Sequence, residues 1–268
     1  MNICIRLVSE SIHPFEIAFF RNLFALLVLV PWFWRLGMAP LKTKRLGLMI
    51  TRGTLNTLCM LAFFTAISFG QLAEVVALSF TAPIYATLLS MVIFSEKVNF
   101  WRWGAIILGF VGVLVVVRPG FEEIGYTQYL VLTSAFGWAI CMVIVKELGR
   151  TESAITITAY TCIVMAPLSL GPAVYYWVWP TWEQLGWLLL LGIFGGSAQL
   201  AMTEALRLAE THVLAPCDFL RLVFISVLGY LIFDQVPNIF VLVGGIIIFA
   251  SIASIAYLEY VRARKGME

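Results

Sequence analysis

Residues 66–98 read AISFGQLAEVVALSFTAPIYATLLSMVIFSEKV, and residues 205–236 repeat the pattern as ALRLAETHVLAPCDFLRLVFISVLGYLIFDQV. The two stretches and the apolar segments before them align at a shift of 139 positions, until one residue is dropped near Ser95. Identical residues occur at eight aligned pairs: Gly53 and Gly192, Leu61 and Leu200, Ala62 and Ala201, Ala66 and Ala205, Phe80 and Phe219, Leu89 and Leu228, Ile93 and Ile232, and Phe94 and Phe233. The chain therefore contains an internal repeat of mostly apolar sequence.

The composition indicates a membrane protein. Of the 268 residues, 62% are hydrophobic and 12% are charged, and an ordinary soluble domain carries about twice that share of charge. A net charge of +2, with basic residues spread among short loops, argues against a nucleic-acid partner. The five cysteines lack CxxC spacing and mostly lie in apolar segments, so we expect neither a disulfide, nor a metal site, nor a cofactor.

Nine segments are long and apolar enough to cross about 30 Å of hydrocarbon, which takes roughly 20 residues. They cover residues 14–36, 46–69, 73–95, 100–117, 127–147, 153–178, 184–206, 213–233 and 237–259. Because backbone groups find no water in lipid and no alternating ten-residue strands occur, we expect all of them to be helices. The predicted fold class is an all-α integral membrane protein.

The repeat predicts five helices per copy, with a first repeat at 1–125 and a second at 126–268. Aligned with the end of span 127–147, residues 1–8 match only the last turns of a helix. We therefore expect only a stub of the first helix. A start codon assigned too late is the favoured explanation, ahead of a trimmed or truly shortened chain. An odd number of spans per copy would insert the second copy upside down, the arrangement with which secondary transporters build alternating access.

Lysine and arginine predict the orientation, because they accumulate in the short cytoplasmic loops of membrane proteins. Only Arg6 and Arg118 fall on one side of the expected spans. The other side receives Arg35, Lys42, Lys44, Arg45, Lys97, Arg102, Lys146, Arg150, Arg207, Arg262, Arg264 and Lys265. We expect a multi-pass protein of the plasma (inner) membrane with loop 37–45 and the C-terminus in the cytoplasm.

Three motifs resemble the EamA-type branch of the drug/metabolite transporter superfamily. They are AEVVALSFTAP at 73–83, FSE at 94–96 and VLAPCDFL at 213–220. The resemblance covers essentially the whole chain. It implies two five-helix copies around a central cavity and a substrate such as an amino acid, a nucleoside-like metabolite, riboflavin or a drug. In relatives the first helix helps to line that cavity.

Charged residues inside a span are candidates for the substrate site, because a charge near the helix centre costs roughly 2.5–3.5 kcal/mol on insertion scales. Arg221 lies about 12 Å into span 213–233 at about 1.5 Å per residue, and Asp218 shares its helix face. We interpret Arg221 as a contact for an anionic group and Asp218 as a contact for a cationic group or a proton, although an internal ion pair fits the same spacing. Arg21 is a further candidate for a substrate carboxylate or a structural hydrogen-bond hub.

Two more charged residues have ordinary explanations. For Arg52, near the cytoplasmic end of its span, the expected behaviour is snorkelling to the interface. Glu74 fits an acid at a helix start, favoured by the dipole, and is with Asp218 a candidate for proton coupling.

Uncharged polar and aromatic residues complete the candidate site. Asn56 and Gln199 lie near the middle of their spans, where they bind a partner helix or a ligand. Trp138 lies at a span centre instead of an interface, so it stacks on a planar ligand or packs in the core, and Tyr85 and Tyr160 are similar candidates.

Glycine and proline suggest a bundle that moves. Gly192 and Gly196 have the GxxxG spacing that lets helices approach closely. Pro83 and Pro216 interrupt corresponding spans and permit bends. Packing and kinking alone would also explain these residues.

These features favour a secondary transporter that moves a small amphoteric or anionic metabolite, with the lipid bilayer as its surroundings and a homodimer as a possible assembly. No P-loop occurs, so ATP hydrolysis is not indicated. Two alternatives are a nonfunctional or scaffold remnant of a transporter and an intramembrane enzyme. The enzyme is disfavoured because Asp218 and Asp234 lie at opposite ends of one helix and no HExxH or GxSxG motif occurs.

Overall fold

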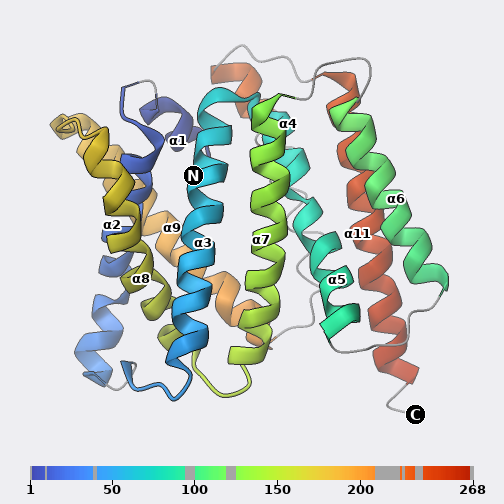
Figure 1. The fold of residues 1–268 in the computed structure, drawn as a ribbon, viewed down its shortest axis with the longest axis horizontal. Coiled ribbons are helices and arrows are strands. Elements are labelled where there is room, and N and C mark those ends of the chain that lie inside the picture. Colours follow the sequence, from blue (N-terminus) through green and yellow to red (C-terminus); the bar gives the residue numbers. More distant parts are fainter. Residues whose placement is uncertain are drawn as a thin grey trace. The chain divides into compact units, whose positions relative to one another are not determined.

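The computed structural model describes residues 2–9, 11–38, 41–93, 100–118, 125–208, 224, 227–232 and 238–265. Within these ranges every regular element is an α-helix and no strand occurs (Figure 1). The all-α prediction is therefore confirmed. The chain forms two compact units. Unit 1 comprises Met1–Phe69 and Cys141–Leu208, and unit 2 comprises Gly70–Ile140 and Ala209–Glu268, so each unit draws on both expected repeats.

In the described part of the chain, five helices are long and apolar enough to cross a membrane. They are α2 (Pro14–Leu36), α3 (Leu46–Phe69), α7 (Tyr126–Leu148), α8 (Ala154–Tyr175) and α9 (Trp182–Leu208). The expected spans agree with four of them to within two residues at each end. The expected span 153–178 is too long, because α8 ends at Tyr175 and the chain continues into the connection to α9.

The other described helices are shorter or have shorter apolar cores. They include α1 (Asn2–Val8), α4 (Leu72–Ser79), α5 (Thr81–Ile93), α6 (Phe100–Val117) and α11 (Ile239–Lys265). The helix α1 covers the residues for which a stub of the first helix is expected. Most of the expected span 213–233, with Pro216, lies outside the described residues.

The expected span 73–95 is two helices, because the α-helical hydrogen-bond pattern breaks at Phe80. The amide of Phe80 donates to the carbonyl of Ala77 at 3.3 Å, a tighter turn than an α-helix makes. Pro83 has no N–H to offer the carbonyl of Ser79, and its ring crowds that carbonyl. The interruption predicted from Pro83 is therefore present.

In unit 1, α2 packs against α8 and α9, and α3 packs against α8. The helices α2 and α8 begin with matching caps: the Nδ1 atom of His13 accepts from the amide of Phe15 at 3.3 Å, and the hydroxyl of Ser153 accepts from the amide of Thr156 at 3.1 Å. These side chains satisfy amides that have no partner inside their helices. The two caps lie 140 positions apart, close to the shift of the sequence repeat.

Two glycines allow the closest approaches between helices of unit 1. A Cβ atom added at Gly53 on α3 would lie 2.7 Å from the Cβ of Val164 on α8. A Cβ atom added at Gly192 on α9 would overlap the side chain of Phe24 on α2. Real Cβ contacts are not this close, so only glycine allows these helix pairs to pack as they do.

Unit 2 is organised around the pair formed by α6 and α11, which α4 and α5 also contact. The two helices meet at Gly112 and Gly244, where a Cβ on Gly244 would lie 2.7 Å from the carbonyl oxygen of Gly112. Nearby, the hydroxyl of Ser251 donates to the carbonyl of Ala105 at 2.6 Å. Small residues and one interhelical hydrogen bond therefore hold this pair together, as is common in membranes.

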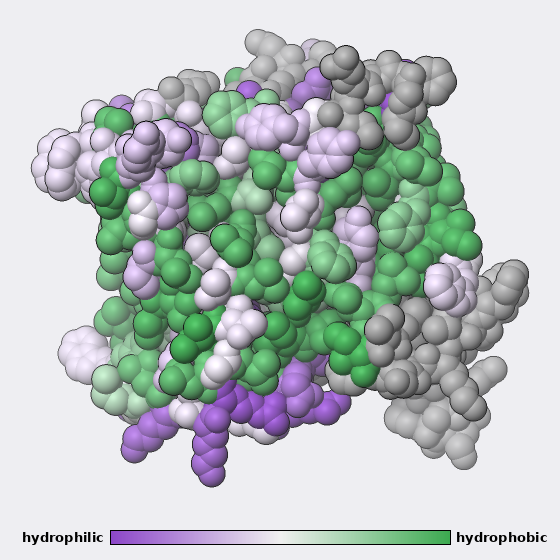
Figure 2. Space-filling view, viewed as in Figure 1, coloured by the Kyte–Doolittle hydropathy of each residue, from purple (hydrophilic) through white to green (hydrophobic). Residues whose placement is uncertain are grey.

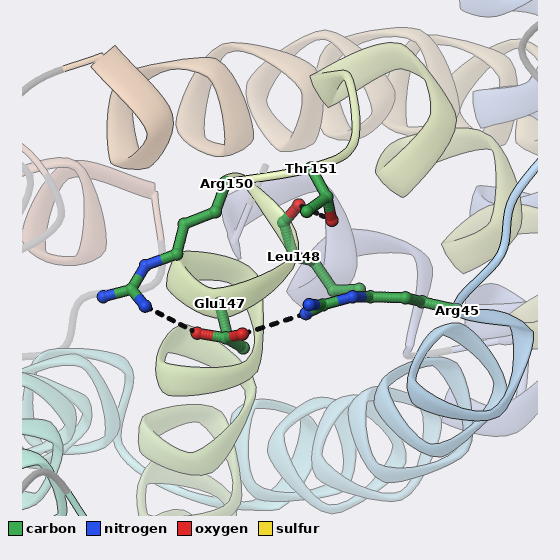
Figure 3. Close-up of polar contacts among 5 residues, drawn as sticks. All are labelled: Arg45, Glu147, Leu148, Arg150 and Thr151. Carbon is green, nitrogen blue, oxygen red and sulfur yellow. Dashed lines mark hydrogen bonds and ion pairs between the residues drawn. The ribbon is translucent and has the colours of Figure 1, made fainter.

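Hydrophobic residues cover most of the face that Figure 2 shows, and strongly hydrophilic residues gather at its lower edge. At this end of unit 1, Glu147 on α7 forms ion pairs with Arg45 at 2.9 Å and Arg150 at 3.2 Å (Figure 3). The hydroxyl of Thr43 also donates to Glu152 at 2.6 Å. The α2–α3 and α7–α8 connections, both expected in the cytoplasm, therefore lie at the same end of unit 1.

Candidate functional site

Arg21 places a positive charge in the interior of unit 1. Its side chain extends from α2 and is 7% exposed. One terminal nitrogen donates to Asn22 Oδ1 at 2.9 Å and to the sulfur of Met60 on α3 at 3.4 Å, and the other donates to the carbonyl of Gly195 on α9 at 3.3 Å. A Cβ atom at position 195 would lie 2.8 Å from Arg21 Nε, so the glycine makes room for this cation. The guanidinium is thus in contact with three helices.

Arg52 on α3 is a second buried cation, and the snorkelling prediction for it is wrong. The residue is 3% exposed, and its guanidinium is turned toward α8, where it donates to the carbonyl of Ile157 at 3.4 Å and to the hydroxyl of Thr161. Snorkelling would have carried the charge to water. Instead, polar groups of the facing helix bind it inside the protein.

Other polar side chains of unit 1 lie near the two guanidiniums. Cys162 on α8 lies near enough to interact electrostatically with both of them. In the same unit, the amide of Asn22 donates to Ser169 Oγ at 3.4 Å, and the amide of Asn56 donates to the sulfur of Met165 at 3.1 Å. Asn56 therefore lies between α3 and α8, as the interhelical alternative predicts.

Neither guanidinium forms an ion pair with any described residue. The Nε atom of each is buried without a hydrogen-bond partner in the described part of the chain. Taking a charge out of water costs several kcal/mol unless an opposite charge and hydrogen bonds compensate. Unit 1 therefore contains two cations that an anionic group could neutralise.

The other predicted site residues have different surroundings. In unit 2, Tyr85 is half-buried with its ring 6.0 Å from that of Phe110 and 5.7 Å from that of Phe136, and Trp138 on α7 is also half-buried. Glu74, in the first turn of α4, accepts from the side-chain amide of Gln128 at 2.6 Å.

In unit 1, the hydroxyl of Tyr160 donates to the carbonyl of Leu41 at 2.6 Å, which ties it to the α2–α3 connection. Gln199 is half-buried on α9. Asp218 and Arg221 lie outside the described residues.

Comparison with known proteins identifies the family. The sequence model of the EamA-like transporter family matches this chain twice, over residues 1–118 and 126–257. The chain belongs to the EamA-like transporter family. It is thus a multi-pass membrane protein of a transporter family and not an enzyme, and the resemblance drawn from its motifs is confirmed.

Curated relatives of this EamA-like protein are named for different small molecules. The S-adenosylmethionine uptake transporter of Rickettsia bellii is 30% identical, over 94% of this chain and 87% of the relative. The riboflavin transporter of Vibrio cholerae is 28% identical, over 93% of this chain and 85% of the relative. The pseudopaline exporter CntI of Pseudomonas aeruginosa is 25% identical, over 99% of this chain and 92% of the relative. These relatives thus include one named for uptake and one named for export.

A solved crystal structure shares the fold of this EamA-like chain. It has a TM-score of 0.69 and 16% sequence identity, over 96% of this chain and 95% of the other. At this identity the likeness concerns the fold alone.

Sequence reasoning about this EamA-like chain missed three polar residues of unit 1: Arg52 as an inward cation, Asn22 and Cys162. Asn22 directly follows Arg21 in the sequence, and that adjacency was the one available signal. The positions of Arg52 and Cys162 in the interior depend on which helices pack against each other, and the sequence alone does not show this.

Proposed function

We propose that this EamA-like protein is a secondary transporter that moves a small anionic or amphoteric metabolite, such as an amino acid or a nucleoside-like compound. The observation that carries the proposal is the pair of buried guanidiniums, Arg21 and Arg52, which lack an ion pair among the described residues. Guanidinium groups bind carboxylates and phosphates through strong charge-assisted hydrogen bonds. Relatives named for S-adenosylmethionine, riboflavin and pseudopaline support a small organic metabolite.

Alternating access between two inverted halves, at 1–125 and 126–268, is the proposed mechanism. Two close approaches support it: Gly53 meets Val164, and Gly192 meets Phe24. The glycines are 139 positions apart and their partners 140, so the contact of α3 with α8 corresponds in sequence position to that of α9 with α2. The two matches to the family model, at 1–118 and 126–257, support the proposed boundaries.

The remaining predicted residues belong to this proposal as further substrate contacts: Asp218, Arg221, Trp138, Asn56, Gln199, Tyr85 and Tyr160. Asp218 and Arg221 carry opposite charges three positions apart, which suits the two ends of an amphoteric molecule.

Uptake into proteoliposomes tests the proposed function. Wild-type protein should exchange at least one of four radiolabelled probes, S-adenosylmethionine, riboflavin, glutamate or adenosine, across the vesicle membrane. The D218N and R221Q variants should lower that flux by about tenfold or more, because each removes a charged hydrogen bond worth about 1.5–3 kcal/mol. Their melting temperatures in detergent should match the wild type. Absence of flux for every probe contradicts transport of this substrate class, and unchanged flux removes Asp218 and Arg221 from the site.

We also propose a plasma (inner) membrane location with the C-terminus in the cytoplasm, in line with the distribution of lysine and arginine. The expected result of labelling intact cells with a membrane-impermeant maleimide is that K44C and K265C are both protected, and that both react after permeabilisation. Protection of only one of them would place loop 37–45 and the C-terminus on different faces and contradict the repeat. A possible homodimer is part of the same proposal.

A further inference from the structure

Glu16 is a buried carboxyl group for which the site described above has no use. It lies in the first turn of α2 and is 0% exposed. Its Oε2 atom accepts a hydrogen bond from the amide of Val178 at 3.1 Å, and its Oε1 atom has no partner among the described residues. A buried carboxylate with one donor and no cation is costly, and binding a proton removes that cost.

The charged groups on the neighbouring parts of the helices packed against α2 have other partners or are exposed, and Glu204 and Arg207 belong to the opposite end of α9. Arg6 on α1 donates to the carbonyls of Ile67 and Ser68 on α3. Arg21 and Arg52 have the partners described above, and Glu183 on α9 is exposed. No described residue forms an ion pair with Glu16.

His13 is the nearest titratable group along α2, and it adds no positive charge near neutral pH. Its ring stacks on Tyr176 with the centroids 3.9 Å apart, and burial lowers the pKa of His13 from its ordinary value. The neutral ring keeps Nδ1 free to accept from the amide of Phe15, which caps α2. Among the described residues, the surroundings of Glu16 therefore offer it no compensating positive charge.

Glu16 also joins α2, from the first proposed repeat, to a segment of the second proposed repeat. Val178 belongs to the connection between α8 and α9, and the side chain of Gln184 on α9 donates to Ser11 at 2.7 Å at the same end. Loss of these contacts would expose Glu16 to water and allow it to ionise. Five residues further along α2 is Arg21, which contacts α9 through Gly195. One helix therefore carries both a proton-binding group and a cation of the proposed substrate site.

We propose that Glu16 binds the proton that couples this transporter to a pH gradient. Oε1 takes a proton from the water on one side of the membrane while this end of unit 1 is open. It holds the proton when the end closes, and it releases the proton to the water on the other side when the substrate site around Arg21 opens there. Protonation favours the closed arrangement because the two states differ in affinity for the proton. The inference rests on the proposed transport function and names Glu16 in place of Asp218 and Glu74 as the coupling carboxyl.

The transport test compares gradient-driven accumulation with counterflow in proteoliposomes, using whichever of the four probes the wild type carries. E16Q should lose pH-driven accumulation by about tenfold or more and keep counterflow, because the glutamine carbonyl still accepts from Val178 but cannot exchange a proton. The matched control is E183Q, an exposed first-turn glutamate of α9, which should behave as the wild type. The proposal is overturned if E16Q accumulates the probe to the wild-type level. It is also overturned if E16Q loses both counterflow and accumulation.

Infrared difference spectra of the detergent-solubilised protein provide a test that needs no substrate. A pH step should reveal the C=O band of a protonated carboxylic acid in the wild type and E183Q, and this band should be absent from E16Q. Persistence of the band in E16Q overturns the assignment. If the wild type carries none of the probes, the proposed function fails, and this band alone decides whether Glu16 binds a proton.

Discussion

Replacing Arg21 with glutamine is expected to lower substrate flux by about ten- to one-hundred-fold while leaving the protein folded. A hydrogen bond to a charged group contributes about 1.5–3 kcal/mol, and about 1.4 kcal/mol corresponds to a factor of ten. The same loss is expected for R52Q. Lysine at either position should restore part of the flux, because it keeps the charge but not the planar fork that binds a carboxylate. Initial uptake rates in proteoliposomes measure all of these variants.

Thermal stability separates a substrate-binding role from a structural one. Arg21 and Arg52 are buried cations without an ion pair in the described part of the chain, so each costs free energy in the absence of substrate. The R21Q and R52Q variants should therefore melt at or above the wild-type temperature in detergent. An anionic substrate should raise the melting temperatures of these variants less than it raises that of the wild type. A structural lock predicts the reverse, a clear drop in melting temperature.

Arg45 provides the matched control. It is also an arginine of unit 1, but it is 35% exposed and pairs with Glu147 at the hydrophilic end. Exposed pairs contribute about 0–1 kcal/mol, so R45Q should change neither flux nor melting temperature appreciably. Wild-type flux in R21Q, or an equal loss in R45Q, would contradict the assignment of the buried cations to the substrate site.

Apolar length predicted most helix boundaries, because a lipid-spanning helix must match the membrane thickness and hydrogen-bond its own backbone. Pro83 predicted the interruption between α4 and α5, because a proline lacks the N–H that would continue the helix. The end of α8 was predicted three residues late, since Trp177 and Val178 continue the apolar run. In the structure, the amide of Val178 binds Glu16 on α2, a tertiary contact that hydropathy does not register.

The site was predictable only where the cost of burial was visible in the sequence. Arg21 lies well inside a span, so an inward orientation followed from energy alone. Arg52 lies close enough to a helix end to snorkel, and its inward orientation depends on Thr161 of the facing helix. Glu16 resembles an ordinary acid at a helix start, favoured by the dipole. Its complete burial comes from the packing of α2 against the connection between α8 and α9.

Leucine at Gly53 and leucine at Gly192 are expected to destabilise the protein by similar amounts, about 1–3 kcal/mol or more each. The reason is overpacking: even a Cβ atom at these positions would overlap Val164 or Phe24, and extra atoms in a packed interior force neighbours off their rotamers. At about 2–4 °C per kcal/mol for a chain of roughly this size, the melting temperature in detergent should fall by several degrees.

Two glycines on the same helices serve as controls. Gly47 on α3 and Gly186 on α9 are exposed, and a Cβ atom at either position would meet nothing within 4 Å. The G47L and G186L variants should therefore melt close to the wild-type temperature. A comparable drop in these controls would show that leucine disturbs α3 and α9 wherever it is placed, and the packing argument would fail.

Equality between G53L and G192L is the sharper part of this prediction. If the contact of α3 with α8 and that of α9 with α2 are copies of each other, the same substitution should have a similar effect at both. The two losses in the free energy of unfolding should then agree within about 0.5 kcal/mol. The double variant should lose roughly their sum if the two sites are independent. Each glycine packs against a helix from the other half of the sequence. The two variants therefore test the packing between the halves as well as the similarity of the halves. A large loss at one glycine with none at the other would contradict the inverted repeat.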